Sequence, residues 1–295
     1  MARPLVAVPN FSDGRSADTI EALGDALARH ATVLDVHADP DHHRSVFTLA
    51  GSGSELVQAL ADGIACARDR IDLRHHEGVH PRVGAADVVP MVAVWPEQLA
   101  SAKQAALALA DRVGDELGLP VLLYGEVALG VRPALLRSGG PAELQRRIDA
   151  GELTPDRGPA RLDPTAGCVL VGARRPLIAF NVNLATDDLS VAQSIAGVVR
   201  ETGGGFHGVR ALGFPLASRR LVQVSMNVED WEASPLDEIV ARIDAEAAAR
   251  RVEVAGSELV GLMPEGAARP GAAALRLESL DESQLLEPRL SRLVS

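Results

Sequence analysis

The stretch from Asp87 to Val127 reads DVVPMVAVW (87–95), PEQLASAKQAALALADRVGDEL (96–117) and LPVLLYGEV (119–127), and it decides the fold class. The first and third pieces are short apolar runs of the kind that form buried strands. The middle piece opens at a proline and repeats its apolar residues at helical spacing, which indicates an amphipathic helix. Strand, helix and strand in this order predict a layered domain in which helices pack on a sheet.

The same alternation extends to both sides of this stretch. Before it, we expect strands at 5–11, 31–39 and 44–51 and helices at 12–30 and 55–71. After it, we expect strands at 176–185, 209–217 and 221–229 and helices at 189–202 and 234–251, and residues 252–264 close this half. The sequence therefore predicts an α/β (α+β) fold of two layered subdomains, each a β-sheet covered by helices, with a substrate crevice between them.

The regular pattern fails between Arg132 and Gly167, where prolines and glycines interrupt the chain. A long irregular stretch inside a compact chain is usually functional or a linker. We place the boundary soon after it, which gives an N-terminal subdomain at 1–176 and a C-terminal subdomain at 177–295. In the second of these, Ser234 stands at the expected cap of the helix 234–251.

The composition argues against several classes of protein. A formal net charge of -11 disfavours nucleic acid and anionic membrane surfaces as partners, so any anion must be bound locally by a few arginines. Lys103 is the only lysine, and its place in an ordinary amphipathic helix argues against Schiff-base chemistry. Cys66 and Cys168 are too few and too far apart for a disulfide framework or a zinc knuckle. No apolar run reaches signal-peptide or transmembrane length, and we expect a soluble cytoplasmic protein.

Histidines give the strongest chemical signal in the chain. Five of the eight fall in two segments, ADPDHHRS (38–45) and DLRHHEGVHPRVGAAD (72–87). Residues 76–80 match HExxH, the zinc-protease pattern, which requires both histidines on one face of a helix. Gly78 interrupts such a helix and Pro81 follows it directly, so a metal site is disfavoured.

Two other interpretations of these histidines remain. One is a set of surface or hydrogen-bonded histidines, which we favour for His30, His42, His75 and His76. The other is acid/base catalysis at His80, which lies in a polar loop between Arg74 and Arg82 and is followed by Asp87. Imidazole titrates near neutrality, so one histidine can accept and return a proton within a catalytic cycle.

The segment HEGVHPRVGAADVVP (76–90) resembles the signature of the glutamate formimidoyltransferases, HPRMGALDVxPF. Further blocks resemble that family in the same order: VAVPNFSDGR (6–15), LDVHADPDHHRSVFTLAG (34–51), LPVLLYGEVA (119–128), DRGPARLDPTAGCVLVGARRPLIAFNVNL (156–184), GFHGVRALGF (205–214), LVQVSMNVEDWEASPLDEI (221–239), VAGSELVGLMPEGA (254–267) and LRLESLDESQLLE (275–287). With this collinear similarity over nearly its whole length, the chain is identified as a member of that family, with the formiminotransferase domain and no cyclodeaminase domain.

The resemblance implies a homodimer and transfer of a formimino group from N-formimino-L-glutamate to N5 of tetrahydrofolate, the co-substrate, in histidine degradation. It implies no metal ion. The family's catalytic histidine, the one before Pro-Arg, is here His80. In this reaction the attacking amine loses a proton and the leaving amine gains one, so one histidine can serve both steps.

The resemblance also implies the substrate contacts. Folate-binding residues are expected where the family has GPSxFVPSWG, at Gly158, Pro159, Ala160, Arg161, Leu162, Asp163, Pro164, Thr165, Ala166 and Gly167. The forked guanidinium groups of Arg44, Arg82 and Arg174, each in a matching block, suit the carboxylates of both substrates. The alternative for these arginines is pairing with Asp35, Asp39 or Asp87. Weaker candidates are Asn10, Glu126, Asn181 and Asn183, and Glu126 is also a candidate to orient His80.

The sequence departs from the family pattern at four positions. Val79 replaces the glutamate that often precedes the catalytic histidine, His43 replaces an asparagine, Ala166 replaces a tryptophan, and His37 stands where a carboxylate occurs. These departures keep two alternatives open: a diverged folate enzyme resembling 5-formyltetrahydrofolate cyclo-ligase, and a non-catalytic folate-binding paralogue. The cyclo-ligase reaction needs ATP, and no glycine-rich phosphate loop is apparent.

Overall fold

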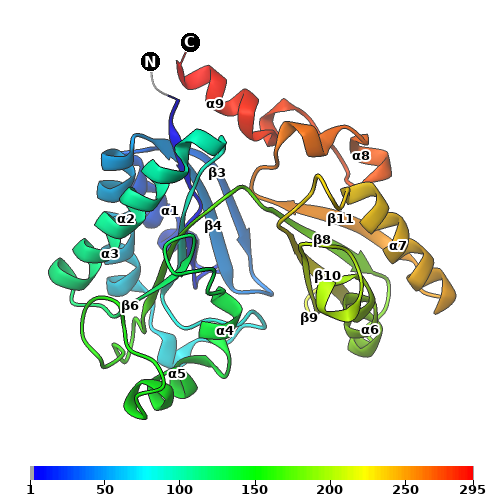
Figure 1. Cartoon of the computed structure of the whole chain (residues 1–295). Coiled ribbons are helices and arrows are strands. Elements are labelled where there is room, and N and C mark those ends of the chain that lie inside the picture. The colour runs from blue at the N-terminus through cyan, green and yellow to red at the C-terminus, as the bar shows by residue number, and fades with distance from the viewer. Residues whose placement is uncertain (1–2, 295) are drawn as a thin grey trace. The chain divides into compact units, whose positions relative to one another are not determined.

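A computed structural model describes residues 3–294 and contains two compact units, which the chain joins between Arg175 and Pro176. Each unit is a β-sheet with helices packed on it, so the predicted α/β class is confirmed (Figure 1). No helix within residues 3–294 is long and apolar enough to cross a membrane.

The sheet of the first unit contains β1 (Leu5–Ala7), β2 (Asn10–Phe11), β3 (Thr32–Asp39), β4 (Arg44–Gly51), β5 (Ala86–Val92), β6 (Val121–Gly125) and β7 (Val169–Arg174). β1 and β2 both lie between β4 and β5 and are antiparallel to them, and β3 pairs with the other side of β4. β5, β7 and β6 follow in that order and are parallel. The expected strand 5–11 is thus two short strands, separated at Pro9, which has no N–H to donate. β7 was not predicted from the sequence.

Three helices cover one face of this sheet: α1 (Ala17–Ala28), α2 (Gly53–Arg70) and α3 (Leu99–Glu116) (Figure 1). α2 begins with a capping box, in which Ser52 and Glu55 each accept the other's backbone N–H. Its apolar side chains recur at helical spacing and are buried against the sheet. There Phe11 and Phe47 meet edge to face with ring centroids 5.6 Å apart.

The other face of the sheet packs against α4 (Pro133–Arg137) and α5 (Gly140–Asp149). These two helices correct the expectation that residues 132–167 are irregular throughout. Pro133 and Pro141 lie in the first turns, where a helix does not use the missing N–H. Gly139 precedes α5 with a φ of 79°, a conformation that favours glycine. Residues that resemble helix breakers therefore begin helices here.

The sheet of the second unit is antiparallel in the order β11-β8-β10-β9, formed by β8 (Ile178–Leu184), β9 (Val209–Leu216), β10 (Leu221–Val228) and β11 (Val254–Val260). Its helices are α6 (Leu189–Val199), α7 (Leu236–Ala249), α8 (Gly271–Ala274) and α9 (Leu286–Val294). The expectation that Ser234 caps α7 is wrong, because Pro235 occupies that position. The Ser234 hydroxyl donates instead to the carbonyl of His207, at 2.8 Å.

The strand directions in the first unit decide which loops lie together. β4, β5 and β7 are parallel to one another, so they begin at the same edge of the sheet, and β2 runs the opposite way and ends at that edge. The turn before β4, the loop before β5, the stretch before β7 and the chain after β2 therefore meet there. The residues that follow β6 and β7 lie at the opposite edge.

Candidate active site

His80 lies in the loop before β5, and both nitrogens of its half-buried ring have partners. Nδ1 is 2.9 Å from the carbonyl oxygen of Pro81, and Nε2 is 3.0 Å from Nη1 of Arg44, the first residue of β4. A carbonyl only accepts and a guanidinium only donates, so the ring proton is assigned to Nδ1 and the lone pair to Nε2. The Pro81 carbonyl and Arg44 therefore both orient the His80 ring.

Positive charge surrounds the His80 ring. Burial lowers the pKa of His80 well below its usual range, and Arg44, Arg137, His42 and Arg82 lower it further. Both effects disfavour the imidazolium, so His80 is neutral at physiological pH. A chain of net charge -11 thus gathers guanidinium groups at one place, as local binding of an anion requires.

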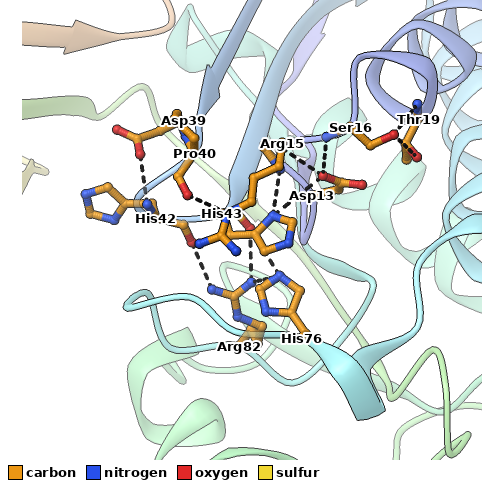
Figure 2. A network of polar contacts seen from close by, with 11 residues as sticks. Asp13, Arg15, Ser16, Thr19, Asp39, Pro40, His42, His43, His76 and Arg82 are labelled. Atoms are coloured by element: carbon orange, nitrogen blue, oxygen red, sulfur yellow. Dashed lines mark hydrogen bonds and ion pairs between the residues drawn. The ribbon is translucent and has the colours of Figure 1, made fainter. Parts of the chain in front are cut away.

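Arg82 holds the His80 loop against the turn between β3 and β4 (Figure 2). Its guanidinium donates to the carbonyl of His43 at 3.0 Å, of His42 at 3.0 Å, and of His80 at 2.8 Å. Gly78 packs onto the same group, and a Cβ at this position would lie 2.7 Å from Nη2 of Arg82. Because these donors are engaged by the chain itself, the structure gives Arg82 a scaffold role and does not offer it as a free substrate contact.

His43 has a left-handed backbone conformation, which explains why the family pattern has asparagine at this position. Its φ is 49°, in the left-handed region that asparagine enters more readily than most residues. Nδ1 of His43 accepts the N–H of Gly14 at 3.1 Å, and the ring stacks on His76 with centroids 4.1 Å apart (Figure 2). Burial, His76 and Arg15 together lower the pKa of His43 to about 4. His43 is thus a neutral residue that supports the turn.

This lowered pKa predicts acid sensitivity. The unfolded chain protonates His43 as the pH falls below 6.5, whereas the folded chain does so only near pH 4, so stability is lost between these values. For His43→Asn, which suits the same φ without a titrating ring, we expect the loss of unfolding free energy between pH 7 and pH 5 to be about 2 kcal/mol smaller than for the wild type. Urea denaturation at both pH values measures it, with His75→Asn, an exposed neighbour, as control. Equal losses in the wild type and His43→Asn would contradict the assignment.

Arg137, the last residue of α4, is a site residue that was not predicted from the sequence. Its Nη2 is 2.7 Å from Oδ2 of Asp87 on β5; the Asp87 side chain is buried and that of Arg137 is 15% exposed. The other Asp87 oxygen accepts the N–H of Val83, in the same loop as His80. The pair ties α4 to this loop and brings a positive charge near Arg44 and His80. The only local signal for it is Pro133, which suits the first turn of a helix.

The stretch 158–167 lies beside the same loop. Backbone hydrogen bonds join the N–H of Ala85 to the carbonyl of Ala166 at 2.8 Å and the N–H of Cys168 to the carbonyl of Val83 at 3.0 Å. The Asp163 carboxylate accepts the N–H of both Thr165 and Ala166, which holds the stretch in a turn. Backbone hydrogen bonds thus join the stretch 158–167 and Cys168 to the loop that carries His80.

Ala166 is 2 % exposed and packs in the core of the first unit. Its side chain therefore faces the core and is not exposed to a ligand. Leu162 and Asp163 are half-buried. The side chains that the stretch does expose are Pro159, Ala160, Arg161 and Pro164.

Glu126 and Arg174 come from the far ends of their strands, and Arg174 acts on the same buried Tyr124 as Arg137 and Asp87 do. Glu126 follows β6 and Arg174 ends β7, so both backbones lie at the edge of the sheet opposite the His80 loop. Glu126 is exposed, and Nη1 of Arg174 donates to the carbonyl of Arg175 at 2.9 Å. Asn10 does lie at the His80 edge, but its side-chain amide donates to the carbonyl of Val8 at 2.9 Å.

Asn181 and Asn183 belong to the second unit, on β8. Their neighbours Phe180 and Val182 are buried in the helix-covered core, so the two asparagines point to the other face of the sheet. There Oδ1 of Asn183 accepts from Nε2 of Gln223 at 2.9 Å. The two asparagines are thus part of a polar cluster built from neighbouring strands.

Residues 76–80 are not helical, so the zinc-protease interpretation of this segment lacks the helix it requires. His76 contacts Arg82, whereas His80 contacts Arg44. Within residues 3–294, no three His, Cys, Asp or Glu side chains are grouped so as to hold a metal ion.

Comparison with known proteins agrees with the two units. The profile described as "Formiminotransferase domain, N-terminal subdomain" matches residues 5–174, and that described as "Formiminotransferase domain" matches residues 179–288. The glutamate formimidoyltransferase of Thermoplasma acidophilum is 39% identical over 97% of this chain and 96% of its own length. That of Streptococcus pyogenes serotype M1 is 37% identical over 98% of this chain and 99% of its own. The formimidoyltransferase-cyclodeaminase of Gallus gallus is 37% identical over 90% of this chain but only 51% of its own length. The chain therefore belongs to the formiminotransferase family.

Proposed function

We propose that this chain is a glutamate formimidoyltransferase, which moves a formimino group from N-formimino-L-glutamate to N5 of tetrahydrofolate. The observation that carries the proposal is the neutral His80, with its proton on Nδ1 and its lone pair on Nε2. Two relatives that the chain matches over 96% and 99% of their length bear this name. The residues that we assign to the reaction are His80 as acid/base, Arg44 as a carboxylate ligand, and the stretch 158–167 as the folate contact.

His80 serves both proton transfers in this proposal. Its Nε2 accepts the proton that N5 of the folate loses while N5 bonds to the amidine carbon. The same nitrogen then returns that proton to the glutamate nitrogen as the old carbon–nitrogen bond breaks. The Pro81 carbonyl keeps the other ring proton on Nδ1, so Nε2 faces the reaction in both steps. Holding two substrates side by side contributes much of the remaining acceleration.

Both substrates carry carboxylates, which suits the positive charge around His80. Arg44 contacts Nε2 of His80, and Arg82 and Arg137 also lower the pKa of His80, so all three add positive charge to this site. Arg82 is engaged with backbone carbonyls and Arg137 with Asp87, which leaves Arg44 as the arginine best able to take a substrate carboxylate.

We expect the purified protein to convert N-formimino-L-glutamate and tetrahydrofolate into 5-formiminotetrahydrofolate and glutamate without ATP. Chromatography with mass detection would follow both products, and a reaction without tetrahydrofolate is the control. Binding of tetrahydrofolate without turnover would contradict the proposal and favour the binding paralogue. ATP-dependent consumption of 5-formyltetrahydrofolate, without formimino transfer, would favour the cyclo-ligase.

The family resemblance also implies a homodimer and a cytoplasmic location, and we propose both on that basis. Sedimentation velocity at micromolar concentration tests the first, since a single chain has a mass of 30.9 kDa and a dimer twice that. A species with the mass of one chain would contradict it. Immunodetection of the protein in fractionated cells of its source tests the second.

A further inference from the structure

We propose that Arg44 caps Nε2 of His80 in the free protein and that a carboxylate of the incoming donor draws the cap away, so that the substrate itself uncovers the catalytic base. This inference rests on the proposed function. It makes Arg44 a positioning residue that couples recognition of an anionic substrate to proton transfer at His80.

The cap is seen directly in the geometry. The N–H at Nδ1 of His80 donates a hydrogen bond to the Pro81 carbonyl, so Nε2 is the ring nitrogen that carries the lone pair. Arg44 donates to that lone pair through Nη1 at 3.0 Å. A nitrogen whose lone pair accepts from a guanidinium cannot accept a proton from a substrate amine at the same time. The base is therefore blocked until Arg44 moves.

Arg44 is the arginine of this site that an anion can recruit. Arg82 bonds several backbone carbonyls and Arg137 bonds a carboxylate, so moving either would break stronger contacts. The Arg44 side chain, by contrast, hydrogen-bonds the neutral imidazole of His80. Charge-assisted bonds to carboxylates are shorter and stronger than bonds to neutral acceptors, so a substrate carboxylate outcompetes His80 for Arg44.

The charges around Arg44 favour the same movement. Burial and the nearby Arg137 lower the pKa of Arg44 to about 10, which means that its charged form is poorly stabilised where it lies. Asp87 and Asp39 offset this effect only in part, and an arriving carboxylate adds further negative charge beside Arg44. Once paired, Arg44 no longer opposes protonation of His80, so the base becomes both accessible and more basic. No atom or electron is exchanged with Arg44, which stays protonated throughout.

The first test needs no substrate. Diethyl pyrocarbonate acylates the free imidazole lone pair, and peptide mass spectrometry resolves its rate at each histidine. We expect His80 to react on the order of tenfold faster in Arg44→Gln than in the wild type, since a hydrogen bond from a charged donor is lost. Arg74→Gln, which removes an exposed arginine of the same loop, is the matched control and should leave the His80 rate unchanged.

His207, whose side chain is 69% exposed, is the internal reference. An unchanged slow rate at His43, whose side chain is 17% exposed in the first unit, shows that the variant is folded there. Arg44→Met, which keeps much of the apolar stem, serves if Arg44→Gln fails that check. Equal His80 rates in the wild type and the folded Arg44 variant would overturn the cap. Because no turnover is measured, this outcome is independent of whether the proposed function is correct.

The second test compares two pH profiles. The groups that face His80 or Arg44 are Asp39 from β3, His42 from the following turn, Arg82 from the His80 loop, Asp87 from β5, and Arg137 from α4. The acid limb of kcat/KM reports His80 in the free protein, and that of kcat reports it in the substrate complex. In the wild type we expect the acid limb of kcat/KM to lie at lower pH than that of kcat. In the free protein Arg44 has no substrate carboxylate beside it, so it lowers the pKa of His80 more than it does in the substrate complex.

In Arg44→Gln the kcat/KM limb should move to higher pH and meet the kcat limb. A purely structural role for Arg44 would lower activity without bringing the limbs together, and limbs that stay separated would overturn the proposal. Failure of formimino transfer in the wild type would instead contradict the proposed function and leave the labelling result as the test of the cap.

Discussion

Replacement of His80 by glutamine is expected to lower kcat for formimino transfer by about 10²- to 10⁴-fold, the range that one positioned acid/base histidine contributes. Glutamine keeps a polar side chain of similar reach but takes up no proton at neutral pH. The loss should fall on kcat, with KM changed far less, because binding is assigned to arginine side chains and to the stretch 158–167. A single-turnover measurement separates the chemical step from product release.

His75→Gln is the matched control for this experiment. His75 lies on the same loop, but it is exposed and is assigned no role in the reaction. We expect its kcat to equal that of the wild type. If His80→Gln kept the kcat of His75→Gln, the acid/base assignment would be wrong, even though formimino transfer itself would stand.

The fold class could be predicted because strands and helices have different apolar periods. Residues 96–117 repeat apolar side chains at helical spacing, and the structure places α3 there, at Leu99–Glu116. Two kinds of element escaped this reasoning. β7 is a short apolar run close to Gly167, and α4 and α5 begin at residues such as Pro133 and Gly139 that usually interrupt structure. Local sequence does not distinguish a helix start from a break when the helix has few turns.

Which residues come together in the site depends on the directions of the strands, and the spacing of apolar residues does not predict those directions. Arg44 and His80 lie 36 residues apart in sequence, and they meet because β4 and β5 begin at the same edge. Glu126 follows β6, and residues that follow a strand are frequent ligand contacts. The parallel pairing of β6 with β7 nevertheless places it at the edge of the sheet opposite the His80 loop. Arg137 has no motif of its own and reaches the site only because α4 packs where Asp87 is buried. His80 itself was singled out by family resemblance, since spacing alone ranked it little above its neighbours.

The buried pair of Arg137 and Asp87 carries the largest expected effect on stability. We expect Asp87→Asn to lower the free energy of unfolding of the first unit by about 3–5 kcal/mol, as when one partner of a buried ion pair is removed. Asparagine keeps an oxygen that can accept the Val83 N–H, so the change isolates the lost charge. The cost is high because Arg137 would then lie buried near Arg44 and Arg82 without a compensating carboxylate.

The opposite change should cost less, and this asymmetry tests the argument. In Arg137→Met the Asp87 carboxylate still accepts the Val83 N–H and still faces Arg44 and Arg82, so its charge remains compensated. For the same reason the double variant Asp87→Asn/Arg137→Met should be more stable than Asp87→Asn alone.

Urea denaturation followed by the fluorescence of Trp95, in a Trp231→Phe background, reports the first unit. Glu143→Gln, which breaks a solvent-exposed pair with Arg146 on α5 of the same unit, should change stability by less than about 1 kcal/mol. If Asp87→Asn were as stable as that control, or if the double variant were less stable than Asp87→Asn, then the Arg137 charge would not depend on the Asp87 carboxylate and the argument would be wrong.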